Sequence, residues 1–327
     1  MDNQNPYGAG GGGGYGAGGG YGAPPGGSGF GPPPGGGGGY PGGPGGGVTP
    51  GNLDIGDVLS TTFRTMGSAL VPILGCALAV VIPTSVLNFG VSVGAYFISQ
   101  EAIRSTGPEA MTAMLLVIPL TFGVALVGIA LQAVGQGGIV YAVAEQLSGR
   151  SPSLGQAFRV GLSRAFWMFL TNLILFFAIF IGIFMCIAPG VIAGIFFAVA
   201  APVCIVEKLG PIDSLSRSVQ LTEGNRMNIF LIGLAVFAGW MVIAFCILMP
   251  VQMLVLGGSA AVAGGGPAGI QAMQDPLSLG QILTQIVNIP VTLFATMAGS
   301  TLVAVIYARL RGLRDGVDAQ AIASVFT

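Results

Sequence analysis

The sequence predicts an all-α, polytopic membrane protein with six transmembrane helices, and three observations support this fold class. Hydrophobic residues make up 53% of the 327 residues and charged residues only 7%, whereas charged residues form about a quarter of a typical soluble domain. The mean hydropathy is +0.83. The uncharged stretches are long enough to cross a hydrocarbon layer of about 30 Å as helices. The predicted membrane domain is 52–327, with spans at about 68–99, 110–144, 165–187, 187–206, 227–256 and 279–308.

Residues 1–51 differ in composition from the rest of the chain. They are largely glycine, proline and tyrosine, and Asp2 is their only charged residue. Such a segment buries too little apolar surface to offset the entropy of ordering it, so the sequence predicts a disordered, low-complexity cytoplasmic tail. We interpret the tail either as a flexible tether or as a source of weak aromatic contacts for self-association or for a soluble partner.

A short amphipathic helix is expected at the start of the membrane domain. Apolar residues recur at helical spacing after Asp54, which suits a helix N-terminus. The uncharged run 68–99 follows, and the polar loop 101–109 separates it from the run 110–144. These segments form the first of three predicted units, each an amphipathic helix followed by a transmembrane hairpin.

The second unit begins at Ser153, which has the spacing of a capping box with Gln156. An apolar helical face follows, and Arg159 and Arg164 fall on the opposite face. The third span is then predicted at 165–187. A tight turn at 188–190, which contains no charged residue, should lead directly into the fourth span.

The third unit is a helix over 211–223, because Gly210 and Pro211 suit its start and Gly224 suits its end. Asp213 and Arg217 stand four residues apart and are expected to pair on its polar side. The fifth and sixth spans follow, and the sixth is expected to end at the basic residues Arg309, Arg311 and Arg314.

Basic residues predict the orientation of the chain. If the N-terminus is cytoplasmic, Arg104 alone lies on the far side, and all other basic residues lie on the cytoplasmic side. This is the positive-inside pattern, and it places both termini of a multi-pass protein in the cytoplasm. The three amphipathic helices should then lie along the inner, cytoplasmic face of the membrane, where anionic lipids attract basic residues.

A motif runs from the fourth span into the fifth. Its residues are Pro202, Glu207, Gly210, Pro211, Arg217, Gly224 and Asn225. With the later run from Tyr307 to Arg311, it resembles the bacterial glycerophosphoryl diester phosphodiesterase membrane-domain family. The resemblance covers roughly 54–326 and implies a six-span module of the bacterial inner membrane. Members that gave the family its name join this module to a catalytic barrel with histidines and an acidic metal site, whereas this chain has no histidine.

The residue inventory argues against several kinds of chemistry. Without histidine, the commonest general base and metal ligand is missing. The four cysteines share no CxxC spacing and are interpreted as core residues. A net charge of −1 disfavours a nucleic-acid partner. We therefore expect no catalytic site, no metal, no cofactor and no enzymatic activity.

Two sets of charged residues have alternative interpretations. Glu207 could mark an ion path, but at the end of a span it is expected instead to pair with Lys208, Arg217 or Arg226. Arg159, Arg164, Arg217 and Arg226 are candidates for binding anionic lipid headgroups, and the alternative is that they only set the topology.

Uncharged polar residues also enter the predicted spans: Asn88, Gln132, Gln136, Asn172, Gln252, Asn288, Ser300 and Thr301. They are expected to hydrogen-bond between helices, or alternatively to line a solute path. Prolines should kink several spans, and broken helices build many transporter sites. The pairs Gly90/Gly94 and Gly190/Gly194 have the spacing of close helix contacts.

These observations favour a non-enzymatic integral inner-membrane protein that acts as a scaffold or accessory factor and binds anionic lipid through its cytoplasmic helices. The alternative is a transporter of a lipid or small solute, with a cavity among kinked spans. The expected partners are membrane lipids and either a soluble protein or a second copy of the chain.

Overall fold

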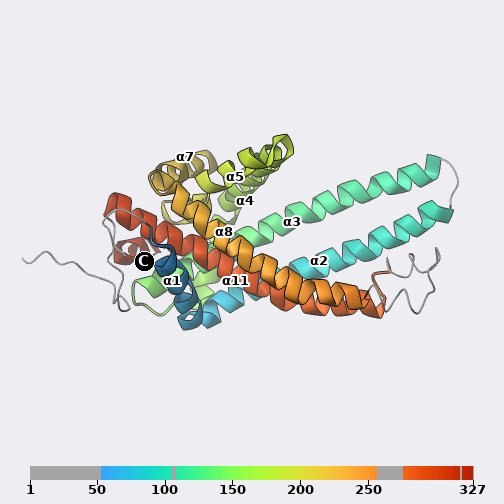
Figure 1. Ribbon diagram of the computed structural model, residues 1–327, viewed down its shortest axis with the longest axis horizontal. Helices are drawn as coiled ribbons and strands as arrows, with labels where there is room; N and C mark the ends of the chain where they lie inside the picture. The colour runs from blue at the N-terminus through green and yellow to red at the C-terminus, as the bar shows by residue number, and fades with distance from the viewer. Residues whose placement is uncertain (1–52, 105–107, 256–274, 317–318, 327) are drawn as a thin grey trace, which may run out of the picture. The chain divides into compact units, whose positions relative to one another are not determined.

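The computed structural model describes residues 53–104, 108–255, 275–316 and 319–326. The predicted tail, residues 1–51, and most of the loop between the last two spans lie outside these ranges. Within them the chain is helical and has no strand, and six helices are long and apolar enough to cross a membrane (Figure 1). The prediction of an all-α polytopic membrane protein is confirmed.

The helices of the described residues follow one another closely. In order they are α1 (Ile55–Ser68), α2 (Leu70–Arg104), α3 (Pro108–Leu147), α4 (Leu154–Met185), α5 (Ile187–Phe196), α6 (Ala200–Val206), α7 (Pro211–Thr222), α8 (Arg226–Ile243), the π-helical turn η1 (Ala244–Leu248), α11 (Leu279–Asp315), α12 (Ala319–Ala323) and the 3₁₀ turn η2 (Ser324–Phe326). The candidate membrane spans are Leu70–Gln100, Leu115–Leu147, Leu154–Met185, Ile187–Val206, Arg226–Val255 and Leu279–Asp315.

Polar side chains cap the helices where local sequence predicts them. Asp54 accepts hydrogen bonds from the backbone N–H groups of Gly56 and Asp57 at the start of α1. Ser153 accepts from the N–H of Gln156 at the start of α4. The capping box is only half formed, because the Gln156 side chain accepts a hydrogen bond from the Tyr141 hydroxyl instead. A contact with α3 therefore replaces the reciprocal bond.

The second predicted unit differs from the expectation. Its amphipathic helix and its span are one continuous helix, α4, with no break near residue 165. No proline interrupts this stretch, so nothing in the chain ends the helix before Met185. The first and third units do keep a separate short helix, α1 and α7, ahead of their spans.

The turn predicted at 188–190 is wrong in position. The extended residue is Cys186, with φ −173° and ψ 148°, and α5 begins at Ile187. Pro189 then lies in the first turn of α5, where its missing N–H leaves no helical hydrogen bond unmade.

The fourth span is broken between α5 and α6, which local sequence patterns do not predict. Ser218 of α7 lies against this break. Its hydroxyl donates to the carbonyl of Phe196 at 2.9 Å and accepts from the N–H of Val199 at 3.3 Å. Backbone groups that lose helical partners inside a membrane protein must be satisfied in this way.

The last span also extends further than predicted. Helix α11 continues through the basic residues to Asp315 and ends at Gly316, which has a positive φ of 64°. Helix α7 ends at Thr222, one residue before the predicted end, and Gly224 has the positive φ expected of a helix-ending glycine, at 85°.

Helix α3 packs against both α2, with which it forms a hairpin, and α4 (Figure 1). Where α3 approaches α4 closely, the glycines in contact lie outside the two predicted glycine pairs. A Cβ atom on Gly161 would lie 2.3 Å from the carbonyl oxygen of Val134, and one on Gly137 would lie 2.7 Å from the Cα of Gly161. Of the predicted pairs, Gly90 and Gly194 face open space, while Gly190 packs tightly against Gly182 in the α4–α5 hairpin.

Candidate functional site

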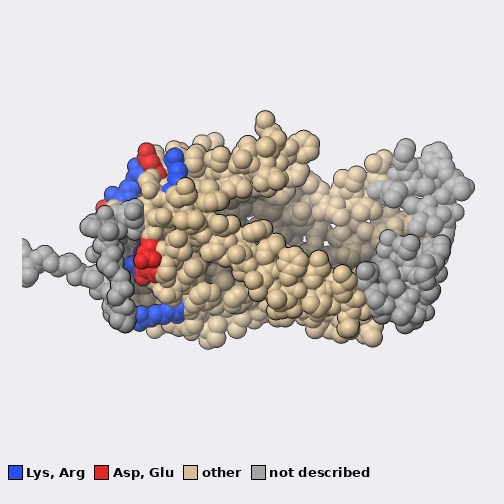
Figure 2. Space-filling model, in the orientation of Figure 1, with Lys and Arg blue, Asp and Glu red and all other residues tan. Residues whose placement is uncertain are grey.

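Charged side chains gather at one end of the helices, and Figure 2 shows uncharged residues over the rest of the described part of the visible face. The ion pairs at this end join α1 to α11, α6 to α7, and α7 to α11. Among them are Asp57–Arg309, Glu207–Arg217 and Arg217–Asp315, together with Glu223–Arg314 near the end of α7.

Glu207 lies at the centre of the most connected of these groups. Its Oε2 is 3.1 Å from Arg217 Nε, and its Oε1 accepts a hydrogen bond from the Tyr307 hydroxyl at 3.2 Å. Arg217 also pairs with Asp315, and Arg311 donates to the Tyr307 oxygen at 2.8 Å. Burial lowers the pKa of Arg217, but the charges of Glu207 and Asp315 outweigh burial and raise that pKa above its usual value. We call these five residues the Glu207 cluster.

The pair predicted between Asp213 and Arg217 is not formed, because Arg217 instead meets acids from α6 and α11. The interpretation of Glu207 as a paired residue at the end of a span agrees with this geometry. Tyr307 lies in α11, and no sequence pattern indicates that it reaches Glu207.

The four candidate headgroup-binding arginines fall into two groups. Arg217 belongs to the Glu207 cluster, and the Arg226 guanidinium lies 4.2 Å from the centre of the Phe196 ring. Both are held by protein contacts. Arg159 is exposed, and Arg164 makes one long hydrogen bond, at 3.5 Å, to the carbonyl of Lys208. Of the four arginines, Arg159 and Arg164 are therefore the two least engaged in contacts with the protein.

The motif residues build the corner between α6, α7 and α8. Pro202 is buried in α6, while Gly210 and Pro211 occupy the N-cap and N1 positions of α7. Asn225 is buried, and its side-chain oxygen accepts a hydrogen bond from the N–H of Leu53 at 2.9 Å. The Asn228 amide donates to the carbonyl of Leu53 at 3.0 Å. The motif thus fixes the start of the membrane domain against α8.

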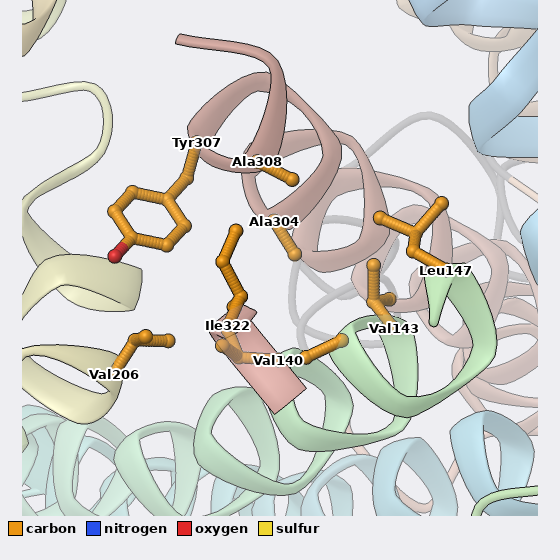
Figure 3. A pocket seen from close by; sticks show the side chains of 9 residues that line it. Val140, Val143, Leu147, Val206, Ala304, Tyr307, Ala308 and Ile322 are labelled. Atoms are coloured by element: carbon orange, nitrogen blue, oxygen red, sulfur yellow. The ribbon is translucent and has the colours of Figure 1, made fainter. Parts of the chain in front are cut away.

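A small apolar pocket lies beside the Glu207 cluster. Figure 3 shows it between α3, α6, α11 and α12, lined by Val140, Val143, Leu147, Val206, Ala304, Tyr307, Ala308 and Ile322. Its volume is about 10 Å³, close to the minimum that holds one water molecule. It is a packing gap and not a ligand site.

A larger polar cavity of about 280 Å³ lies between α3, α4, α11 and the break between α5 and α6. Its polar side chains are all uncharged: Gln132, Gln136, Asn172, Thr296 and Ser300. The Asn172 amide donates to the Gln136 side-chain oxygen at 3.1 Å, across α3 and α4. Most of the wall is apolar, with Phe197 and Ala198 from the break, Ala201 and Pro202 from α6, and Val140, Leu175, Ala295, Gly299 and Val303 from the long helices.

The depth of this cavity follows from helix geometry. Asn172 lies about 12 Å along α4 from Arg164. Gln136 lies about 14 Å along α3 from Glu145, and Ser300 lies about 14 Å along α11 from Arg309. Because half of a hydrocarbon layer is about 15 Å thick, the polar cavity lies near the middle of the membrane if the charged end marks its surface.

Of the eight uncharged polar residues predicted within spans, Gln132, Gln136, Asn172 and Ser300 line this cavity. The other four do not. Asn88 donates to the carbonyl of Thr84 in its own helix. Asn288 and Gln252 line neither this cavity nor the small pocket. Sequence patterns identify the right residue types, but they do not indicate which of them share a cavity.

In the described ranges, no three His, Cys, Asp or Glu side chains come together as metal ligands, and Cys76, Cys186, Cys204 and Cys246 are free. No family model, curated protein or solved structure matches the chain. The polar cavity and the charged end are therefore the features from which a function can be inferred.

Proposed function

We propose that this integral membrane protein is not an enzyme and that it binds an uncharged polar group in the polar cavity, as a transporter or carrier of a lipid or small solute. The observation that carries the proposal is a cavity of about 280 Å³, beside a broken helix, in which amide and hydroxyl side chains lie among mostly apolar residues.

The cavity side chains favour a hydrogen-bonding ligand. In the part of the chain that the structure describes, the Gln132 amide and the Ser300 hydroxyl have no protein hydrogen-bond partner. These two groups border the cavity, where a ligand or an ordered water can hydrogen-bond to them. None of the described residues that line the cavity is charged, which favours a neutral ligand group over an ion.

The broken helix supports the same proposal. Irregular backbone at membrane depth is tolerated where it is buried in protein or lines a cavity. Transporters place substrate sites at such interruptions. Here the break brings Phe197 and Ala198 into the cavity wall, and Ser218 satisfies the backbone groups on either side.

Native mass spectrometry tests the proposal. The full-length protein, released gently from its membrane, should retain a small molecule of defined mass. Asn172→Leu should lose most of it, because the substitution removes the amide that bonds to Gln136. Asn88→Leu is the matched control, since Asn88 bonds within its own helix. Equal retention by all three proteins, or no retained molecule in any of them, would overturn the proposal.

A scaffold that binds anionic lipid is the second candidate, and the exposed start of α4 favours it. Arg159 lies there beside Phe158 and Leu162, which are 37% and 69% exposed. Such a mixed surface suits a helix at a lipid–water boundary. Arg159→Gln with Arg164→Gln should then weaken binding of the protein to anionic lipid, and a native mass spectrum with unchanged anionic lipid would count against this role.

A further inference from the structure

A second hollow of about 610 Å³ lies between α1, α8 and α11. Its wall is apolar and aromatic, with Leu59, Phe63, Phe237, Trp240, Phe294 and Leu302 among its residues, and no described residue that lines it is charged. Ligand pockets commonly measure about 300–1,000 Å³. We call it the apolar groove.

The polar cavity and the apolar groove meet at α11. Both are lined by Ala295 and Gly299, which lie one helical turn apart. Thr296 and Ser300 face the polar side, whereas Ala298 and Leu302 face the apolar side. A Cβ atom on Gly299 would meet no atom of a neighbouring element within 4 Å. Small residues therefore separate the two hollows.

We propose that one amphipathic ligand occupies both hollows: a lipid whose uncharged, hydroxyl-bearing headgroup lies in the polar cavity and whose acyl chain crosses α11 at Ala295 and Gly299 into the apolar groove. This inference rests on the proposed function and names its ligand class. A solute without a chain would leave the apolar groove unused, and a bulk lipid chain alone would leave the polar cavity without a hydrogen-bonding partner.

The chemistry of the two walls selects this class. Amide and hydroxyl side chains donate to and accept from hydroxyl groups, and among the described residues neither wall offers a cation that would pair with a phosphate. The groove wall contains the large aromatic side chains of Phe63, Phe237, Trp240 and Phe294, which present broad apolar surface to a hydrocarbon chain. The face that Figure 2 shows is hollowed among uncharged residues.

Photocrosslinking tests the inference in the full-length protein, reconstituted into phosphatidylcholine vesicles. The probe is a monoacylglycerol with a diazirine near the end of its chain, and peptide mass spectrometry locates the labelled residues. The label should concentrate on α8 residues of the groove, around Phe237 and Trp240. Gly299→Leu should reduce labelling there by at least about tenfold, because the new side chain fills the crossing point. Gly128→Leu is the matched control, since its Cβ also meets no neighbouring atom within 4 Å but Gly128 lines neither hollow.

The outcomes separate the inference from the proposed function. Groove labelling that falls in Gly299→Leu and Asn172→Leu, but not in Gly128→Leu, supports a ligand that spans both hollows. Labelling spread over all exposed apolar faces, or equal in Gly299→Leu and Gly128→Leu, overturns the inference. In that case the proposed function still holds if native mass spectrometry shows a small molecule of defined mass that wild type retains and Asn172→Leu loses. If that retention also fails, both are wrong.

Discussion

Ser218 shows how one residue makes a broken membrane helix possible. It is fully buried, and its hydroxyl bonds to backbone groups on both sides of the break between α5 and α6. Ser218→Ala leaves the buried N–H of Val199 and the partly buried carbonyl of Phe196 without this partner. We expect the substitution to destabilise the protein by about 1–3 kcal/mol.

The measurement is thermal unfolding in a mild detergent. Ser216→Ala is the matched control, because Ser216 is exposed on the same helix. We predict a lower midpoint for Ser218→Ala only. Equal midpoints for the two variants would show that the break needs no side-chain support.

Glu223 provides a prediction about pH. The hydrogen bond from Arg314, at 2.9 Å, and the charge of Arg314 hold the pKa of Glu223 below its ordinary value of 4.5. Because the folded pKa is the lower one, the contribution to stability is complete above the unfolded pKa and is lost as pH falls through the folded pKa. The effect is small, since this carboxylate side chain is 64% exposed.

Glu223→Gln should therefore remove part of the stability that wild type loses as the pH falls below about 4.5, the ordinary pKa of a glutamate, and should change little at pH 7 apart from the lost ion pair. Unfolding midpoints measured across this range compare the two proteins. A variant with the same acid dependence as wild type would show that the Arg314 pair does not couple to folding.

At the scale of elements, the packing of α3 on α4 depends on glycine. The Cβ of an alanine at Gly161 would lie 2.3 Å from the carbonyl oxygen of Val134 and 3.0 Å from the backbone nitrogen of Gly138. Because backbone cannot move aside as a flexible side chain can, we expect Gly161→Ala to force the helices apart, at a cost of about 1–3 kcal/mol.

Gly128→Ala on α3 is the control, because its Cβ enters open space and alanine is the better helix former. Its unfolding midpoint should stay the same or rise, while that of Gly161→Ala should fall. If Gly161→Ala were as stable as wild type, the two helices would not pack at so short a distance. Because Gln136 and Asn172 bond across the same two helices, a looser pair would also enlarge the polar cavity.

The elements also show which features a sequence predicts and which it does not. The starts of α1, α4 and α7 follow from Asp54, Ser153, Gly210 and Pro211, because caps are local chemistry. The break between α5 and α6 has no such signal, because the residue that supports it, Ser218, lies on another helix. The boundary expected near residue 165 is wrong, because amphipathic character changes along α4 without any residue that ends a helix.

The candidate site is predicted unevenly for the same reason. The position of Glu207 at the end of a span predicts a basic partner, but Tyr307 and Asp315 reach the cluster from α11 through tertiary packing. Asn172 and Gln136 are identifiable in the sequence as polar residues within spans. Their hydrogen bond and their common cavity depend on the approach of α3 to α4, which no local pattern encodes.

At the scale of the whole molecule, the gathering of charged residues at one end predicts the topology. Six spans would place both ends of the membrane domain on the same side, and from the basic residues we predict that this side is the cytoplasm. A green fluorescent protein fused after the last residue should therefore fluoresce. Alkaline phosphatase at the same position should be inactive, and the opposite pair of results would reverse the orientation.

The two hollows are also a property of the whole molecule, because α1, α3, α4, α8, α11 and the α5–α6 break all contribute to their walls. The central claim is that the polar cavity holds an uncharged polar group. The most direct test is a density map of the full-length protein, solubilised with its native lipids. We predict non-protein density within hydrogen-bonding distance of Gln132, Asn172 and Ser300. A cavity closed by protein side chains, or open but lined by hydrocarbon density that makes no polar contact, would contradict this claim.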